Sequence, residues 1–178
     1  MDASGNVTFP ANATCSGTAS GFGKFASYAI IADQKSSTTE GGVFSIGDWR
    51  TRDLNTEISD ADSIVSLSSN QFTLQAGTYL INAVAPACQV SSHQTRIYNV
   101  TDTAVVQLGQ VVFSYSSSGS GSSSYVSGRV TITGAKVFEI QHRCATSRAD
   151  YGFGVGTSGA YNWSSGTVFA ICEIYKEA

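Results

Sequence analysis

The segment FEIQHRC, residues 138–144, combines residue types that could form a nucleophilic or a metal site. His142 and Cys144 are separated by a single residue. A histidine beside a thiol could be a general base next to its nucleophile, or half of a metal site. In an extended segment alternate side chains lie on the same face, so these two residues share a face with Phe138 and Ile140. The alternatives are therefore chemistry at a cleft and packing within a strand.

Packing is favoured, because an apolar face disfavours a thiolate and makes a cysteine inert. Only two histidines occur, His93 and His142, and apart from the His142–Cys144 pair neither has a ligand at a recognised metal-site spacing. Three cysteines fall in strand-like segments and could form a thiol cluster if those strands were adjacent: Cys88, Cys144 and Cys172. Apolar packing is the favoured interpretation for them too. We therefore predict no catalytic residue, no metal, no cofactor and no enzymatic activity.

Glycine-flanked loops hold better candidates for binding. In GTSGAYNWSSG, Tyr161, Asn162 and Trp163 stand where no local pattern buries them. Aromatic rings can stack on sugar C–H surfaces, and an amide can hydrogen-bond sugar hydroxyls. Alternatively, Trp163 folds inward and closes the end of the domain. Tyr115 and Tyr125, which flank a Ser/Gly-rich segment, form a secondary candidate platform.

The segment GDWRTRDLNTE is rich in charge. Arg50 and Arg52 are expected to share a face, with Trp49 and carboxylates nearby. They could bind an anionic sugar or a lipid phosphate. A salt-bridge lattice at the surface or between subunits is the favoured interpretation.

The elements that position these residues are predicted to be strands. From residue 25 to 178, short β-type segments alternate with turn signals, and no stretch keeps helical periodicity. The segments are FASYAII, GVFSI, WRTRDLN, SIVSLSS with NQFTLQ, TYLINAVAPACQV, HQTRIYNV, TAVVQLGQVVFSY, SYVSGRVTIT, KVFEIQHRC, YGFGVG and TVFAICEIYK. About ten strands without a helix predict an all-β, antiparallel two-sheet sandwich or jelly roll. Residues 1–24 are small and polar and are expected to be a connector or shaft end.

Composition excludes several classes of partner. Charged residues make up 13% of the chain and the net charge is -3, so we expect no nucleic-acid binding. No apolar run approaches the length of a membrane span, so membrane insertion is not expected. The first residues show no secretory signal, and we expect the cysteines to be reduced thiols.

Two segments are apolar on both faces of the predicted strand. In TYLINAVAPACQV, Leu80 and Val84 lie on the face opposite to the alternating apolar set that begins with Tyr79. In TVFAICEIYK, Phe169 and Ile171 lie on the face opposite to the alternating apolar set that contains Ala170. One face of an antiparallel sandwich sheet normally meets water. Double-sided apolarity therefore predicts a second covering partner, and subunit association is the simplest one.

The order of several motifs carries a family resemblance. AGTY opens a long strand, an Arg-Tyr-Asn strand follows, and TGAK turns into KVFEIQ; this order resembles the jelly roll of tumour-necrosis-factor and complement-type globular heads. Five sequence motifs are similar to those of the C-terminal tip domains of bacteriophage tail fibres: GDWRTRDLNTE, LQAGTYLI, RIYNVTD, FEIQHRC and EIYKEA. The DASGNVTFP start is similar to the short β-repeats that join such tips to a fibre shaft.

The resemblance implies a homotrimer at the end of a virion fibre, assembled in the host cytoplasm and joined to the shaft or other virion proteins. Its receptor would be a bacterial surface glycan or another surface molecule. Within such a trimer, we expect Glu139, Gln141 and Arg143 to pair across subunits near the threefold axis. A structural virion trimer, either a capsid decoration or a fibre-assembly protein, is the alternative, and a glycan depolymerase is a third.

If that topology holds, the last strand ends beside the start of the first, and the turns at the other end face the host. Strand counting assigns to that end the turns at 89–93, 133–136 and 156–166. It places the Ser/Gly-rich segment at 114–125 toward the shaft or on the flank, with the TAVVQL strand counted as an extra one.

Overall fold

The structure, a computed structural model, describes residues 25–117, 119–156 and 166–178. These residues form eleven strands and no helix, which confirms the all-β prediction. The strands are β1 (Phe25–Lys35), β2 (Arg50–Thr51), β3 (Thr56–Ser59), β4 (Val65–Ser68), β5 (Gln71–Leu74), β6 (Gly77–Cys88), β7 (Ser91–Asn99), β8 (Ala104–Ser114), β9 (Gly121–Ile132), β10 (Lys136–Cys144) and β11 (Thr167–Glu177). Residues 1–24, the predicted connector, lie outside the described residues.

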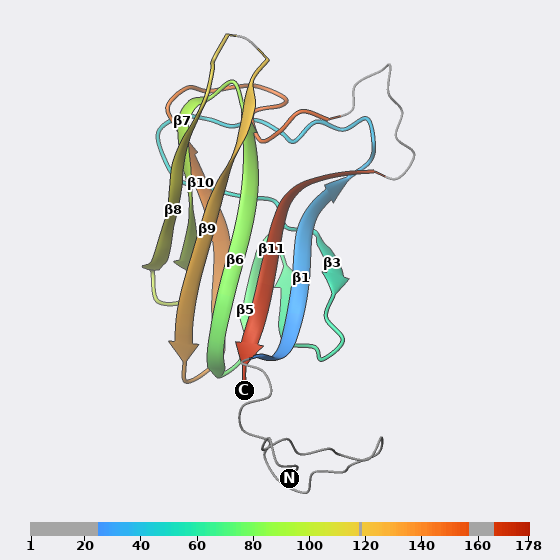
Figure 1. Cartoon of the computed structure of the whole chain (residues 1–178), viewed down its shortest axis with the longest axis vertical. Helices are drawn as coiled ribbons and strands as arrows, with labels where there is room; N and C mark the ends of the chain where they lie inside the picture. The colour runs from blue at the N-terminus through green and yellow to red at the C-terminus, as the bar shows by residue number, and fades with distance from the viewer. Residues whose placement is uncertain (1–24, 118, 157–165) are drawn as a thin grey trace, which may run out of the picture.

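The strands form two sheets that face each other (Figure 1). The first sheet has the order β3-β1-β11-β6-β9, and the second has the order β4-β5-β10-β7-β8, with the short β2 paired to β10. Every pairing between these strands is antiparallel. Because spatial neighbours such as β1 and β11 are distant in sequence, the chain crosses repeatedly between the sheets, as in a jelly roll.

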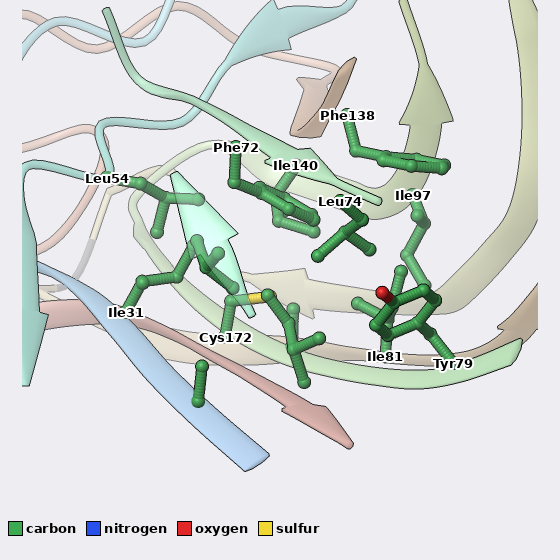
Figure 2. Close-up of a cluster of buried hydrophobic side chains, with 14 of the residues drawn as sticks. Ile31, Leu54, Phe72, Leu74, Tyr79, Ile81, Ile97, Phe138, Ile140 and Cys172 are labelled. Atoms are coloured by element: carbon green, nitrogen blue, oxygen red, sulfur yellow. The ribbon is translucent and has the colours of Figure 1, made fainter. Parts of the chain in front are cut away.

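The core lies between the sheets and follows from the alternation of side chains along each strand. On β6, Tyr79, Ile81 and Ala83 are buried, and they face the buried Phe72 and Phe138 of the second sheet. The rings of Phe72 and Phe138 are stacked with centroids 5.8 Å apart. Figure 2 shows this cluster, with side chains from both sheets pointing into one apolar interior.

Two segments expected to be strands are not. GVFSI and YGFGVG form only isolated bridges, Gly42 to Tyr151 and Phe44 to Arg148. Close backbone contacts explain this arrangement. A side chain at Gly152 would lie 2.6 Å from Cβ of Phe44, so the two segments approach too closely for a bulkier residue. They cover one end of the sandwich instead of extending a sheet.

The two ends of the sandwich differ in what they hold. Phe25 pairs with Glu177, so the start of β1 lies beside the end of β11, as predicted (Figure 1). Cys88 at the end of β6 pairs with Gly121 at the start of β9, at the opposite end of the sandwich. We call this second end, which carries the 89–90 and 115–120 turns, the distal end.

Two turn placements expected from strand counting are wrong. The turn at 133–136 lies next to Gly77, which pairs with Ile132, and is therefore at the end that holds the C-terminus. The Ser/Gly-rich turn at 115–120 lies at the distal end instead of near the shaft (Figure 1). The cause is β8, which was counted as an extra strand but pairs along β7 from Ser91 to Asn99. One additional full-length strand reverses the directions expected for β9 and β10, which follow it.

Candidate functional site

The histidine of FEIQHRC has a histidine partner. Nε2 of His142 lies 2.8 Å from Nδ1 of His93, and Nε2 of His93 lies 2.8 Å from Oγ of Ser122. Ser122 donates its hydroxyl proton to the carbonyl oxygen of Phe113. Its oxygen must therefore accept from His93, and the remaining nitrogen of His93 must accept from His142. The chain of bonds assigns both rings to the neutral form protonated on Nε2, and it leaves Nδ1 of His142 without a partner.

Burial keeps this pair neutral. It lowers the pKa of His93 to about 4 and the pKa of His142 well below its usual value, and the nearby positive charge of Arg52 adds to both shifts. The Cys144 thiol lies 4.0 Å from the carbonyl oxygen of Phe44, and burial raises its pKa. Neither nitrogen of His142 bonds to this thiol, so the two residues do not form a base and its nucleophile. The absence of enzymatic activity stays a prediction.

The three described cysteines do not form a cluster. Cys88, Cys144 and Cys172 are free, as expected for reduced cysteines. Cys172 lies opposite Ala83 on β6, and Cys144 belongs to the other sheet, so the conditional thiol cluster does not form. Among the described residues, no three His, Cys, Asp or Glu side chains could hold a metal ion together. The described residues also contain no helix long and apolar enough to span a membrane.

The interpretation of GDWRTRDLNTE as a charge lattice is wrong for Arg52. This side chain is fully buried, donates to the carbonyl oxygens of Pro86 and Phe153, and has its guanidinium 4.1 Å from the centroid of the Phe153 ring. Burial lowers the pKa of Arg52 to about 10. Arg50 is half-buried and points to the carbonyl oxygens of Ser45 and Ile46. Among the described residues, neither arginine forms an ion pair.

The first sheet has an apolar outer face, as the two-sided strands predicted. Ile171, Val84 and Tyr125 are paired side by side across β11, β6 and β9, and their side chains are 39%, 41% and 40% exposed. Between them lies a shallow depression of about 240 Å³. Tyr28 of β1 is exposed on the same face, and we call these four residues the apolar face. Nothing within the described chain covers them.

The edge strand β8 carries a second exposed apolar surface. The positions of β8 that pair with alternate residues of β7 face outward, at a spacing altered by two register shifts, and their large side chains are 46% to 65% exposed. These residues, which we call the β8 stripe, are Val105, Leu108, Val111 and Phe113. An edge strand with an uncovered apolar row is unusual in a monomeric protein, because such edges pair or aggregate.

The three residues expected at a trimer axis are bonded within their own chain. Glu139 and Gln141 are buried; Glu139 accepts from Gln71 at 3.0 Å and from Gln141. Arg143 is exposed and donates from Nη2 to Oε1 of Gln94 at 3.0 Å. Contact with a sister chain stays a prediction for all three.

Beside them lies a cluster that sequence reasoning missed. The guanidinium of Arg96 is 4.1 Å from the centroid of the Trp49 ring and 4.7 Å from that of Tyr98, and the guanidinium of Arg143 is 4.7 Å from Trp49. We call these four residues the Arg–Trp cluster. The available signal was the alternation of Arg96 and Tyr98 in RIY, which places both on the polar face of β7. The sequence could not show that Trp49 folds onto them.

A pocket of about 330 Å³ opens next to this cluster. Its walls come from the 46–47 loop, the start of β7, the end of β10 and one residue of β8: Ile46, Gly47, Ser92, His93, Gln94, Val111, Arg143, Cys144 and Ala145. Because β7 begins and β10 ends at the distal end, the pocket lies on the outer side of the second sheet near that end. We call it the Arg143 pocket.

Of the residues predicted to bind a receptor, the structure describes only the two tyrosines that flank the Ser/Gly-rich segment. Tyr161, Asn162 and Trp163 lie outside the described residues, so their role stays a prediction. Tyr115 is 65% exposed at the distal end, with its ring edge-on to Phe113 at 5.2 Å. Tyr125 lies on the apolar face, with its hydroxyl 3.3 Å from Oδ1 of Asn82. The two tyrosines therefore belong to different surfaces and do not form one platform.

No protein-family model and no curated protein sequence matches this chain. Solved structures do match its fold. The globular domain of zebrafish complement 1qA protein superposes with a TM-score of 0.54 and 10% identity, over 84% of this chain and 96% of that chain. Eiger TNF from S. frugiperda gives a TM-score of 0.54 and 10% identity, over 87% and 94%. The PRD1 vertex protein P5 gives 0.54 and 11%, over 86% and 99%.

These similarities establish the fold and nothing finer at such low identity. The chain has the two-sheet jelly roll of complement and tumour-necrosis-factor heads, which confirms the fold expected from the order of its motifs. A tail-fibre location is a finer statement than the fold can support.

Proposed function

We propose that this chain is the head of a homotrimeric virion protein that binds a bacterial surface receptor without catalysis. The observation that carries the proposal is the row of Ile171, Val84 and Tyr125. It lies exposed on the outside of a sandwich whose interior is already filled by other side chains. Burial of such a row stabilises an assembly by roughly 25 cal/mol per Å² of apolar surface.

The placement of the exposed apolar residues favours a ring of copies. The apolar face lies on the first sheet, whereas the β8 stripe lies along the edge of the second sheet. Two different patches on one chain form a head-to-tail contact, and such contacts close into a ring when the rotation permits. A three-membered ring is the assembly that the sequence resemblance implies.

The virion setting is supported by the fold shared with a vertex protein and by the resemblance of the sequence motifs to those of fibre tips. Within that setting we propose a tail-fibre tip, assembled in the host cytoplasm, whose distal end faces the cell. Three copies of a weak glycan site on one trimer would bind a repetitive bacterial surface with useful avidity.

Light scattering on the purified chain tests the assembly. We expect a mass about three times the 18.6 kDa of one chain. Ile171→Glu places a charge in the proposed contact and should yield a folded single copy. The matched control is Val43→Glu at an exposed loop residue outside both apolar surfaces, and it should remain trimeric. A monomeric wild-type protein at micromolar concentration would refute the assembly.

Binding of the labelled trimer to bacterial cells tests the receptor role. Tyr161→Ala and Trp163→Ala should abolish binding while the mass stays that of a trimer. A wild-type trimer that binds no cells would favour the alternative of a structural virion trimer. Release of reducing ends from host polysaccharide would instead favour a depolymerase.

A further inference from the structure

We infer that the Arg143 pocket binds a sugar unit that carries an anionic substituent, a carboxylate or a phosphate. This inference rests on the proposed function, because it names the chemical class of the glycan. The sequence had suggested an anionic ligand for Arg50 and Arg52, but the structure buries Arg52. The guanidinium group that lines the pocket is that of Arg143, and that of Arg96 lies beside it in the Arg–Trp cluster.

Both guanidinium groups have unused donors. Within the part of the chain that the structure describes, Arg96 donates only from Nε, to Oε1 of Gln141 at 2.6 Å, and Arg143 donates only from Nη2, to Gln94. Contact with Trp49 occupies the face of each guanidinium and leaves its N–H edge free. An edge with two free N–H groups matches a carboxylate or phosphate in a bidentate geometry.

The local positive charge is only partly offset. Among the described residues, neither Arg96 nor Arg143 takes part in an ion pair, and both use neutral glutamine oxygens as acceptors. The carboxylate of Glu139 is buried and is held by the amides of Gln71 and Gln141. The negative charge of Glu139 partly offsets that of Arg96, whereas Arg143 has no ion-pair partner among the described residues, so Arg143 marks a local site for an anion.

The walls of the pocket suit a sugar better than a bare ion. Ile46 and Val111 supply apolar surface for a ring, while Ser92 and Gln94 place a hydroxyl and an amide beside Arg143. A volume of about 330 Å³ is sufficient for one sugar unit. Val111 belongs both to the pocket and to the β8 stripe, whereas Arg143 lies on β10, on the other side of β7 from the stripe.

Titration of the full-length protein with matched sugars tests the inference. Glucuronate and glucose 6-phosphate are compared with glucose, and galacturonate with galactose, by isothermal titration or ligand-observed NMR. We expect at least one anionic sugar to bind tenfold or more tightly than its neutral counterpart. Comparison of the two uronates with glucose 6-phosphate distinguishes a carboxylate ligand from a phosphate ligand. Equal affinity for charged and neutral sugars, or no binding of any anionic sugar, would overturn the inference.

Arg143→Gln provides the decisive variant. It removes the free donors and the charge from an exposed side chain and should weaken binding of the anionic sugar by about tenfold to a hundredfold. Arg143→Lys, which keeps the charge but not the planar edge, should give an intermediate loss. Lys136→Gln makes the same change of charge at the opposite end of the sandwich and should bind like the wild type. Wild-type affinity in Arg143→Gln would place the anion elsewhere.

Cell binding separates this inference from the proposed function. If Arg143→Gln trimers bind cells and anionic sugars as the wild type does, the pocket assignment fails while the receptor role stands. If the wild-type trimer binds the anionic sugar in an Arg143-dependent way but binds no cells, the inference stands and the receptor role fails.

Discussion

The two outer faces of the sandwich are built from the same alternation of side chains but carry opposite chemistry. On the first sheet, Val84 and Ile171 leave apolar side chains exposed. On the second sheet, the corresponding outward positions of β10 are Glu139, Gln141 and Arg143, which join a network of amides and guanidinium groups. An exposed apolar face is stabilised by being covered, whereas a hydrogen-bonded polar face is stable in water. The first face is therefore suited to assembly, and the polar part of the second face, which lies beside the β8 stripe, is suited to recognition.

The interior behind the two faces differs as well. Apolar side chains fill most of the space between the sheets, as in Figure 2. Toward the distal end the interior of the second sheet instead holds His93, His142 and the fully buried Arg52. Burial of polar groups is costly unless they are hydrogen-bonded; the bonds of His93 to its two partners meet that requirement, whereas Nδ1 of His142 and Nε of Arg52 have no partner among the described residues.

The largest expected effect is on assembly. Val84→Asp on the apolar face and Leu108→Asp on the β8 stripe should each abolish the trimer, because an unpaired carboxylate buried in a contact costs several kcal/mol. Val137→Asp, on the outer side of the second sheet, should leave the mass unchanged. Sedimentation velocity measures all three. Dissociation by Val137→Asp alone would reverse the roles assigned to the two faces.

Acid should destabilise the fold through the buried histidines. The pKa of His93 is lowered to about 4 in the folded chain, against about 6.5 when unfolded, so the unfolded state binds more protons between these values. Stability is therefore present above pH 6.5 and is lost as the pH falls toward 4, by about 3 kcal/mol from His93 alone. Urea unfolding at pH 7 and at pH 4.5 measures this loss.

His93→Gln serves as the control for this pH dependence, because glutamine can still accept from His142 and donate to Ser122. Its stability should decline less between the two pH values than that of the wild type. An equal decline in both proteins would assign the acid sensitivity to carboxylates elsewhere.

Trp49→Ala should have a smaller effect, confined to the second face. The indole contacts two guanidinium groups, and each such contact at a partly exposed site contributes about 0.5–1 kcal/mol. We expect a loss of about 1–2 kcal/mol in the free energy of unfolding, with no change in mass. A change in the oligomeric state would show that Trp49 belongs to the assembly contact.

The smallest effect is expected at Tyr115. Its ring is largely exposed and packs edge-on against Phe113, so Tyr115→Ala should change the unfolding free energy by about 0.5 kcal/mol or less. Any loss of cell binding in this variant would then report receptor contact and not damage to the fold. A cost above about 2 kcal/mol would show that the distal turn supports the sandwich.

Local patterns predicted some features of the site and missed others. The shared face of His142 and Cys144 followed from alternation alone, and so did the exposure of Val84 and Ile171. The bond between His142 and His93 could not be predicted, because it depends on β10 lying beside β7 in one register. Arg52 looked like a surface charge, and its burial depends on the 150–156 segment folding over it.

Local sequence patterns were sufficient to predict a sandwich of antiparallel strands that leaves apolar side chains exposed on the outer face of one sheet. Those properties follow from side-chain period and composition, which act over a few residues. Tertiary structure alone decided which distant side chains meet: Trp49 with Arg96 and Arg143, and His93 with His142. Strand order and register set these contacts. They are chosen by packing of the whole core, so no single segment contains the information.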